Sequence, residues 1–118
     1  MSKAAIIILA AGDAPESLGR VVNALMAAYE FKQAGDEVRI LFDGAGVQAA
    51  AAFAQPDHKY HELYQRISDK VTGACDYCSG AFEVTDSVKE AGIPLVDEFK
   101  GHPSFRSLAD AGFTLMTF

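Results

Sequence analysis

The chain has 118 residues, half of them hydrophobic, and a formal net charge of −6 at pH 7. This length suits one domain spanning residues 1–118, and the apolar share argues against a disordered chain. The ten lysines and arginines are scattered. We therefore expect no cationic face that would bind a nucleic-acid partner.

The first apolar run, from Ala4 to Ala10, is too short and too weakly flanked by charge to be typical of a secretory signal. We interpret it as a buried strand. No apolar run approaches the length needed to span a membrane, so we expect no membrane partner. Two cysteines are too few for a secreted disulfide framework. The expected location is therefore the cytoplasm, where thiols stay reduced.

Strand-like and helix-like patterns alternate along the chain. Helices are predicted from Pro15 to a stop at Gly35, and over about 47–53, 57–71, 75–91 and 104–111. Strands are predicted at about 4–10, 37–42, 70–74, 93–96 and 113–118. Pro94 suits the start of a strand or a sheet edge. The alternation predicts an α/β fold, a three-layer α/β/α sandwich with a five-stranded parallel sheet.

In such sheets, ligands gather at the carboxyl ends of the strands. One loop expected there begins after the second strand with Asp43, Gly44, Ala45 and Gly46. Its glycines permit close backbone approach, so Asp43, Gly44 and Gly46 are candidate ligand-binding residues. An ordinary turn explains the same glycines, and the spacing is not that of a dinucleotide-binding loop.

The only two cysteines, Cys75 and Cys78, share one turn at the start of a predicted helix. Two thiols at this spacing can form a disulfide, hold a metal or pass sulfur between them. A helix N-terminus lowers a thiol pKa. We therefore expect Cys75 to be the more nucleophilic thiol and Cys78 to be the resolving one, covered by Phe82. Two inert, buried cysteines are the alternative.

The three histidines bear on metal binding and on proton transfer. A structural zinc site needs four ligands, and no third cysteine exists. His58 and His61 have a spacing that could chelate a metal, although surface histidines commonly bind nothing. His102, between Gly101 and Pro103, could approach the cysteines and act as a base, although a turn alone explains its position. We expect neither a metal nor a cofactor.

Several segments, in this order, resemble the DsrE/DsrF-like sulfur-relay family. They are the long helix ending at Ala34-Gly35, the run Glu37–Val47, the cysteine after the third strand, the run Ala91–Val96, and the end Ala111–Phe118. The resemblance covers nearly the whole chain. It implies an α/β/α sandwich that assembles as a homotrimer or homohexamer.

The family resemblance also implies a function. Family members carry sulfur as a cysteine persulfide between partner proteins, and their active cysteine corresponds to Cys75. The implied partners are therefore sulfur donor and acceptor proteins. Two alternatives stay open: a non-enzymatic assembly or regulatory module of the same fold with inert cysteines, and a small dithiol redox protein that uses Cys75 and Cys78.

Overall fold

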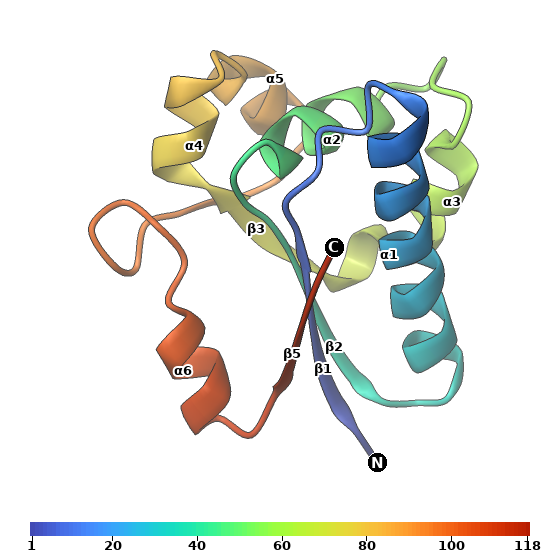
Figure 1. Cartoon of the computed structure of the whole chain (residues 1–118), viewed down its shortest axis with the longest axis vertical. Helices are drawn as coiled ribbons and strands as arrows, with labels where there is room; N and C mark the ends of the chain where they lie inside the picture. The colour runs from blue at the N-terminus through green and yellow to red at the C-terminus, as the bar shows by residue number, and fades with distance from the viewer.

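A five-stranded, wholly parallel sheet organises the protein (Figure 1). The computed structural model describes all 118 residues. The strands lie in the order β4-β3-β2-β1-β5. Their bounds are β1 (Lys3–Ile8), β2 (Glu37–Phe42), β3 (Val71–Cys75), β4 (Leu95–Val96) and β5 (Thr114–Thr117).

Helices connect every pair of consecutive strands. They are α1 (Pro15–Gln33), α2 (Gly46–Phe53), α3 (His61–Ile67), α4 (Asp76–Ala81), α5 (Thr85–Glu90) and α6 (Phe105–Asp110), with a 3-10 turn, η1 (Ser68–Lys70), before β3. The predicted α/β class and the five-stranded parallel sheet between two helical layers are confirmed.

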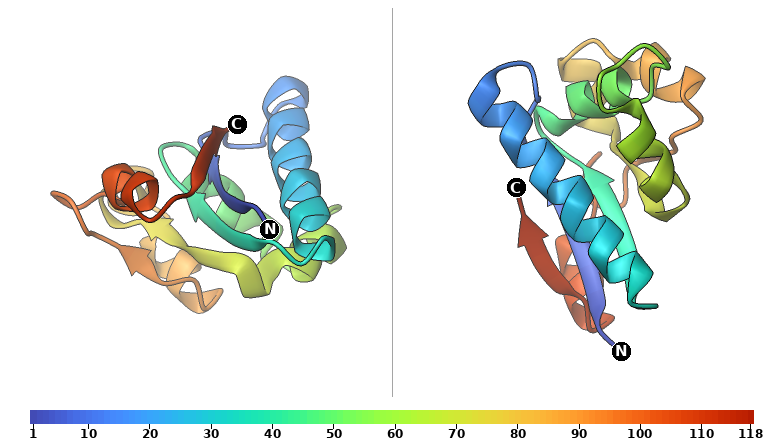
Figure 2. Two further views of the ribbon diagram at one scale, coloured as in Figure 1. Left: turned by 90° about the horizontal axis from the view of Figure 1, so that it is seen from below. Right: turned by 90° about the vertical axis from the view of Figure 1, so that its right-hand side faces the viewer.

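The two helical layers are unequal. Right-handed crossovers that move in one direction along a sheet place their helices on one face. The connections from β1 to β4 all move in one direction, and α1 to α5 contribute to a single core cluster. The last connection returns across the sheet to β5, and α6 therefore packs on the opposite face (Figure 2).

The apolar run of β1 supplies both faces of the sheet. Ile6 and Ile8 belong to the larger core beneath α1, whereas Ala5 belongs to a small cluster with Leu108 of α6. None of the three isoleucines of this strand is exposed. A parallel strand covered on both faces does not need alternating polarity, which is why the apolar run predicted a buried strand.

Two helix predictions from the sequence are wrong. The helix expected over 75–91 is two short helices, because the backbone turns at Glu83, where φ is 58°. The helix expected over 57–71 is the shorter α3, which begins at His61 with Tyr60 as its N-cap. The prediction for Pro94 is confirmed, since it lies directly before β4, which forms one edge of the sheet. No helix combines the length and the apolar character that a bilayer crossing requires.

We predict that Gly46→Ala strongly destabilises the fold. A Cβ at Gly46 would lie 1.9 Å from the carbonyl oxygen of Ile8, a backbone atom that cannot move aside cheaply. We expect a loss of about 3 kcal/mol or more in the free energy of unfolding, at the upper end of overpacking effects. Chemical denaturation measures it.

Gly19→Ala is the matched control. Gly19 lies inside α1, and a Cβ there would meet nothing within 4 Å. Alanine is the better helix former, so this variant should gain about 0.5–1 kcal/mol. Equal stability of the two variants would contradict the close approach of α2 to the end of β1.

Candidate functional site

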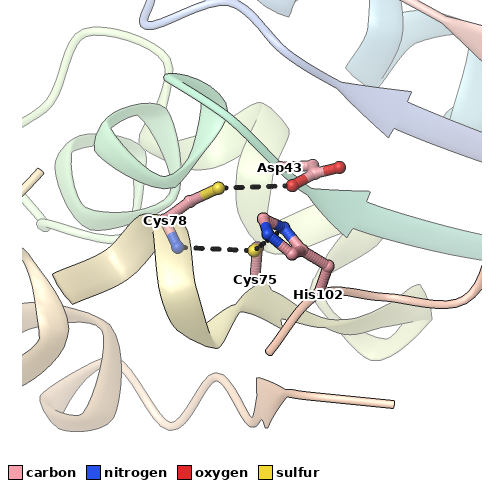
Figure 3. A group of neighbouring side chains, drawn as sticks. All are labelled: Asp43, Cys75, Cys78 and His102. Atoms are coloured by element: carbon pink, nitrogen blue, oxygen red, sulfur yellow. Dashed lines mark hydrogen bonds between the residues drawn. The ribbon is translucent and has the colours of Figure 1, made fainter. Parts of the chain in front are cut away.

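Four side chains from distant parts of the sequence meet at the carboxyl edge of the sheet (Figure 3). They are Asp43 after β2, Cys75 at the end of β3, Cys78 in α4, and His102 in the connection from β4 to α6. One potential ligand atom from each lies within 4.8 Å of all the others. This cluster is the candidate site.

Cys75 joins β3 to α4. It is the last residue of the strand and the N-cap of the helix, and its Sγ accepts the backbone N–H of Cys78 at 3.4 Å. Its carbonyl oxygen accepts the hydroxyl of the buried Ser79 at 2.7 Å. The expectation that the helix directs an amide at this sulfur is confirmed.

A tight turn positions His102. Phe99 and His102 exchange backbone hydrogen bonds of 2.8 and 2.9 Å. Between them, Lys100 and Gly101 have φ values of 50° and 86°, as in the two-residue turns of hairpins. The carbonyl of Gly101 accepts the N–H of Tyr77 at 2.9 Å, which attaches the turn to α4.

The turn brings the imidazole to the thiol. His102 Nδ1 lies 3.3 Å from Cys75 Sγ. The ring of Tyr77 lies beside it, with centroids 5.1 Å apart. The expectation that His102 approaches the cysteines is therefore confirmed. Its role as a base stays a prediction.

Asp43 is held at the end of β2. Its N–H donates to the carbonyl oxygen of Ile8 at 2.9 Å. Its Oδ1 accepts the N–H of Gly44 at 2.9 Å and the thiol of Cys78 at 3.5 Å. Gly44 takes a positive φ of 52°, whereas Gly46 is needed for packing against β1. Ligand binding by Asp43, Gly44 and Gly46 stays a prediction.

Burial dominates the electrostatics of Cys75. Its side chain has no exposed surface. Desolvation raises the pKa of this thiol from its ordinary 9.0 to about 12; the Cys78 N–H opposes the rise, and the Cys78 thiol and the Asp43 carboxylate add to it. The sequence-based expectation of a lowered pKa is wrong, because the apolar surroundings outweigh the short helix.

The two thiols differ in their exposure. The cover of Cys78 by Phe82 stays a prediction, and Phe82, the C-cap of α4, is itself 39 % exposed. Cys78 retains 9 % exposure, whereas Cys75 retains none. Cys78, the thiol that the sequence assigned as the resolving one, is therefore more accessible than Cys75.

The other two histidines do not form a metal site. His58 precedes α3, stacks on Phe53 and accepts the N–H of Tyr60 through Nδ1 at 3.0 Å. His61 Nδ1 lies 2.9 Å from the carbonyl oxygen of Phe53. No third ligating side chain joins them.

The sequence alone did not indicate the contact between Asp43 and Cys78, or that His102 joins them as a potential metal ligand. The available signal was topological. Asp43 and Cys75 end neighbouring parallel strands, and such ends meet at one edge of a sheet.

Two hollows flank the structure. One of about 280 Å³ lies away from the cluster and is lined by residues of α3 and of the segment 91–94, among them His61, Tyr64 and Pro94. The other, of about 480 Å³, lies beside the His102 turn and is lined by Phe99, Pro103, Ser104, Phe105 and Arg106. Phe99, which lines the second hollow next to the candidate site, is 63 % exposed.

Comparisons with known proteins identify the fold and no activity. No family model matches the chain. It is 26 % identical over 96 residues to the uncharacterized protein MJ0733 of Methanocaldococcus jannaschii, covering 81 % of this chain and 78 % of that protein. A solved structure, the conserved protein of unknown function BT1422 from Bacteroides thetaiotaomicron, superposes with a TM-score of 0.65 at 18 % identity, covering 97 % of this chain and 94 % of the other.

We predict that Cys75 in the Cys78→Ser variant, prepared without metal ions, is alkylated more slowly at pH 8 than a free cysteine is. A pKa raised from 9.0 to about 12 leaves about a thousandfold less thiolate at this pH. The rate should keep rising with pH until about 12. Iodoacetamide labelling followed by mass spectrometry measures it.

The same variant in denaturant is the control, because unfolding removes the burial that raises the pKa. Its rate should level off near pH 9. A folded protein whose rate levels off below pH 8 would contradict the dominance of burial.

Proposed function

We propose that the protein carries sulfur as a persulfide on Cys75, within a sulfur-transfer system of the kind implied by its resemblance to DsrE/DsrF-like proteins. The observation that carries this proposal is the 3.3 Å separation of Cys75 Sγ from His102 Nδ1 at the carboxyl edge of the sheet. A thiol paired with an imidazole is a common arrangement for a cysteine nucleophile. A cytoplasmic location suits two free thiols.

The chemistry needs only groups already in the cluster. His102 takes the thiol proton through Nδ1, and Cys75 Sγ attacks the outer sulfur of a donor persulfide. The donor's sulfur–sulfur bond breaks, the donor leaves as a thiolate, and the imidazolium returns the proton to it. An acceptor thiol later gives its proton to His102 and attacks the outer sulfur of the Cys75 persulfide. The sulfur–sulfur bond at Cys75 breaks, and the imidazolium returns the proton to the Cys75 thiolate. No oxidant or reductant is consumed.

Burial suits a carrier better than a freely turning-over enzyme. Cys75 is closed off by the turn that carries Gly101 and His102, and the Gly101 carbonyl accepts its thiol at 3.6 Å. Because Cys75 has no exposed surface, a donor reaches its sulfur only after the groups that cover it shift, with His102 still within reach of the thiol. A persulfide stored beneath the closed turn is then protected from solvent and from stray thiols.

A second candidate function is a dithiol redox couple. It is favoured by the sulfurs of Cys75 and Cys78, which lie within 4.8 Å of each other and are both free. In this case mild oxidation joins them in a disulfide with the loss of two hydrogens, and a thiol reductant restores them.

The decisive experiment is intact mass measurement of reduced, metal-free protein after incubation with glutathione persulfide. We expect the wild type to gain one sulfur atom and Cys75→Ser to gain none. Cys78→Ser should keep its added sulfur longer, because Cys78 can otherwise attack Cys75 Sγ, release hydrogen sulfide and form a disulfide. His102→Ala should accept sulfur about a hundredfold more slowly, the lower range for loss of a general base.

His58→Ala is the matched control, since His58 lies outside the cluster. Sulfur addition that survives Cys75→Ser would overturn the assignment. Loss of two hydrogens under a mild oxidant, together with no sulfur gain in Cys78→Ser after glutathione persulfide, would favour the redox couple. No change in mass with either reagent would favour a non-enzymatic module with inert cysteines.

We also propose that the protein forms a homo-oligomer, a trimer or hexamer by family resemblance. The support is β5, an edge strand that pairs only with β1 and whose Leu115 is 37 % exposed. Unpaired, partly apolar edges favour association.

Light scattering at micromolar concentration tests the assembly, and Leu115→Lys should shift its mass toward the monomer. Met26→Lys is the control, because Met26 is also an exposed apolar residue (49 %) but belongs to α1 and not to an edge strand. A monomeric wild type would contradict the proposal.

A further inference from the structure

We propose that Asp43, Cys75, Cys78 and His102 bind one divalent transition-metal ion, with zinc as the best match. This inference does not depend on sulfur transfer. It departs from the sequence-based expectation of no metal, because the fold brings Asp43 and His102, which are distant in the sequence, to the two cysteines.

Two of the donor pairs already have the spacing that a tetrahedral ion requires, and the whole set is only slightly wider. Zinc holds sulfur at about 2.3 Å and nitrogen or oxygen at about 2.0–2.2 Å, so neighbouring ligand atoms lie roughly 3.3–3.8 Å apart. Cys75 Sγ lies 3.3 Å from His102 Nδ1, and Cys78 Sγ lies 3.5 Å from Asp43 Oδ1. All four atoms lie within 4.8 Å of one another, so small side-chain rotations bring them to one ion.

The chemical nature of the donors selects the metal. Two thiolates and an imidazole favour zinc and similar ions over magnesium or calcium, which prefer oxygen ligands. Two cysteines three positions apart on one turn are a frequent half of zinc sites. Binding releases the two thiol protons, and the two positive charges of the ion offset two of the three negative charges on the thiolates and the Asp43 carboxylate.

The surroundings already orient the ligands. The Cys78 N–H points at Cys75 Sγ, and the Gly44 N–H holds Asp43 Oδ1. The backbone bonds of the turn hold His102, whose Nδ1 faces the sulfur. Loss of the Cys75 thiol proton leaves the Gly101 carbonyl satisfied, because it still accepts the N–H of Tyr77. Such supporting contacts are typical of metal sites.

Metal binding and sulfur loading exclude each other at this site. A Cys75 sulfur bound to zinc cannot at the same time attack a donor persulfide. The metal-bound protein is therefore a resting form in which both thiols are also protected from oxidation, and removal of the ion restores them.

Anaerobic titration of the reduced protein with cobalt(II), a spectroscopic substitute for zinc, tests the site. We expect saturation at one equivalent, an intense thiolate-to-cobalt charge-transfer band, visible bands typical of tetrahedral cobalt, and displacement by zinc. The absence of a thiolate-to-cobalt band in the wild type would overturn the proposal, whatever the outcome of the persulfide experiment.

Single substitutions test the ligand set. Changes in groups around a metal commonly cost about 10–100-fold in affinity, and loss of a ligand should cost at least as much. We expect this weakening in His102→Ala and Asp43→Asn. The matched controls are His58→Ala and Asp97→Asn. Neither His58 nor Asp97 belongs to the cluster, so both variants should bind cobalt as the wild type does.

His102→Cys tests whether weaker binding in His102→Ala reflects loss of a ligand or a failure to fold. It should restore tight binding with a stronger charge-transfer band, because a third thiolate replaces the imidazole. Wild-type affinity and spectrum in both His102→Ala and Asp43→Asn would overturn the four-ligand site and leave only adventitious binding by the thiol pair. Since sulfur loading is measured on metal-free protein, either proposal can fail alone.

Discussion

The arrangement of the site depends on Cys75, where one residue ends a strand and begins a helix. Its backbone pairs in the sheet, and its sulfur accepts the amide of Cys78 as the cap of α4. A strand that ends in an N-cap fixes the direction in which the chain leaves the sheet. The second cysteine is thereby placed on the same side as the end of β2, where Asp43 stands.

Two opposing effects act on this sulfur, and their sizes decide its state. A helix terminus stabilises a nearby charge by about 0.3–1 kcal/mol, which is less than one pKa unit. Complete burial among the residues of the core raises the pKa from 9.0 to about 12. The thiol form therefore prevails in the closed structure. Chemistry at Cys75 therefore requires either a proton acceptor, the role that we propose for His102, or a cation.

The layers of the fold were predictable because they follow from strong, local patterns. The run of isoleucines in β1 identifies a strand buried on both faces, and Pro94 indicates the edge of the sheet. These features depend only on periodicity and backbone chemistry, so they are visible without tertiary contacts.

The interruption of the helix near Glu83 was not predictable in the same way. Neither was the contact of Cys78 with Asp43. No glycine or proline marks the turn between α4 and α5, where a non-glycine residue takes a positive φ. The distance between Asp43 and Cys78 depends on strand order, which the sequence did not specify. The burial of Cys75 depends on a turn about 26 residues further along the chain, so its pKa could not be judged from the helix start alone.

The topology also explains why the segment between β4 and α6 lies against Cys75. Three crossovers cover one face of the sheet, but only the return to β5 covers the other. The segment between β4 and α6 is therefore the part of that layer that reaches the site. It is attached to α4 by the bond from Tyr77 to Gly101, and its Lys100 takes an uncommon backbone conformation. Because the Gly101 carbonyl and the His102 ring both contact Cys75 Sγ, the burial of this thiol depends on the position of the turn as well as on the core.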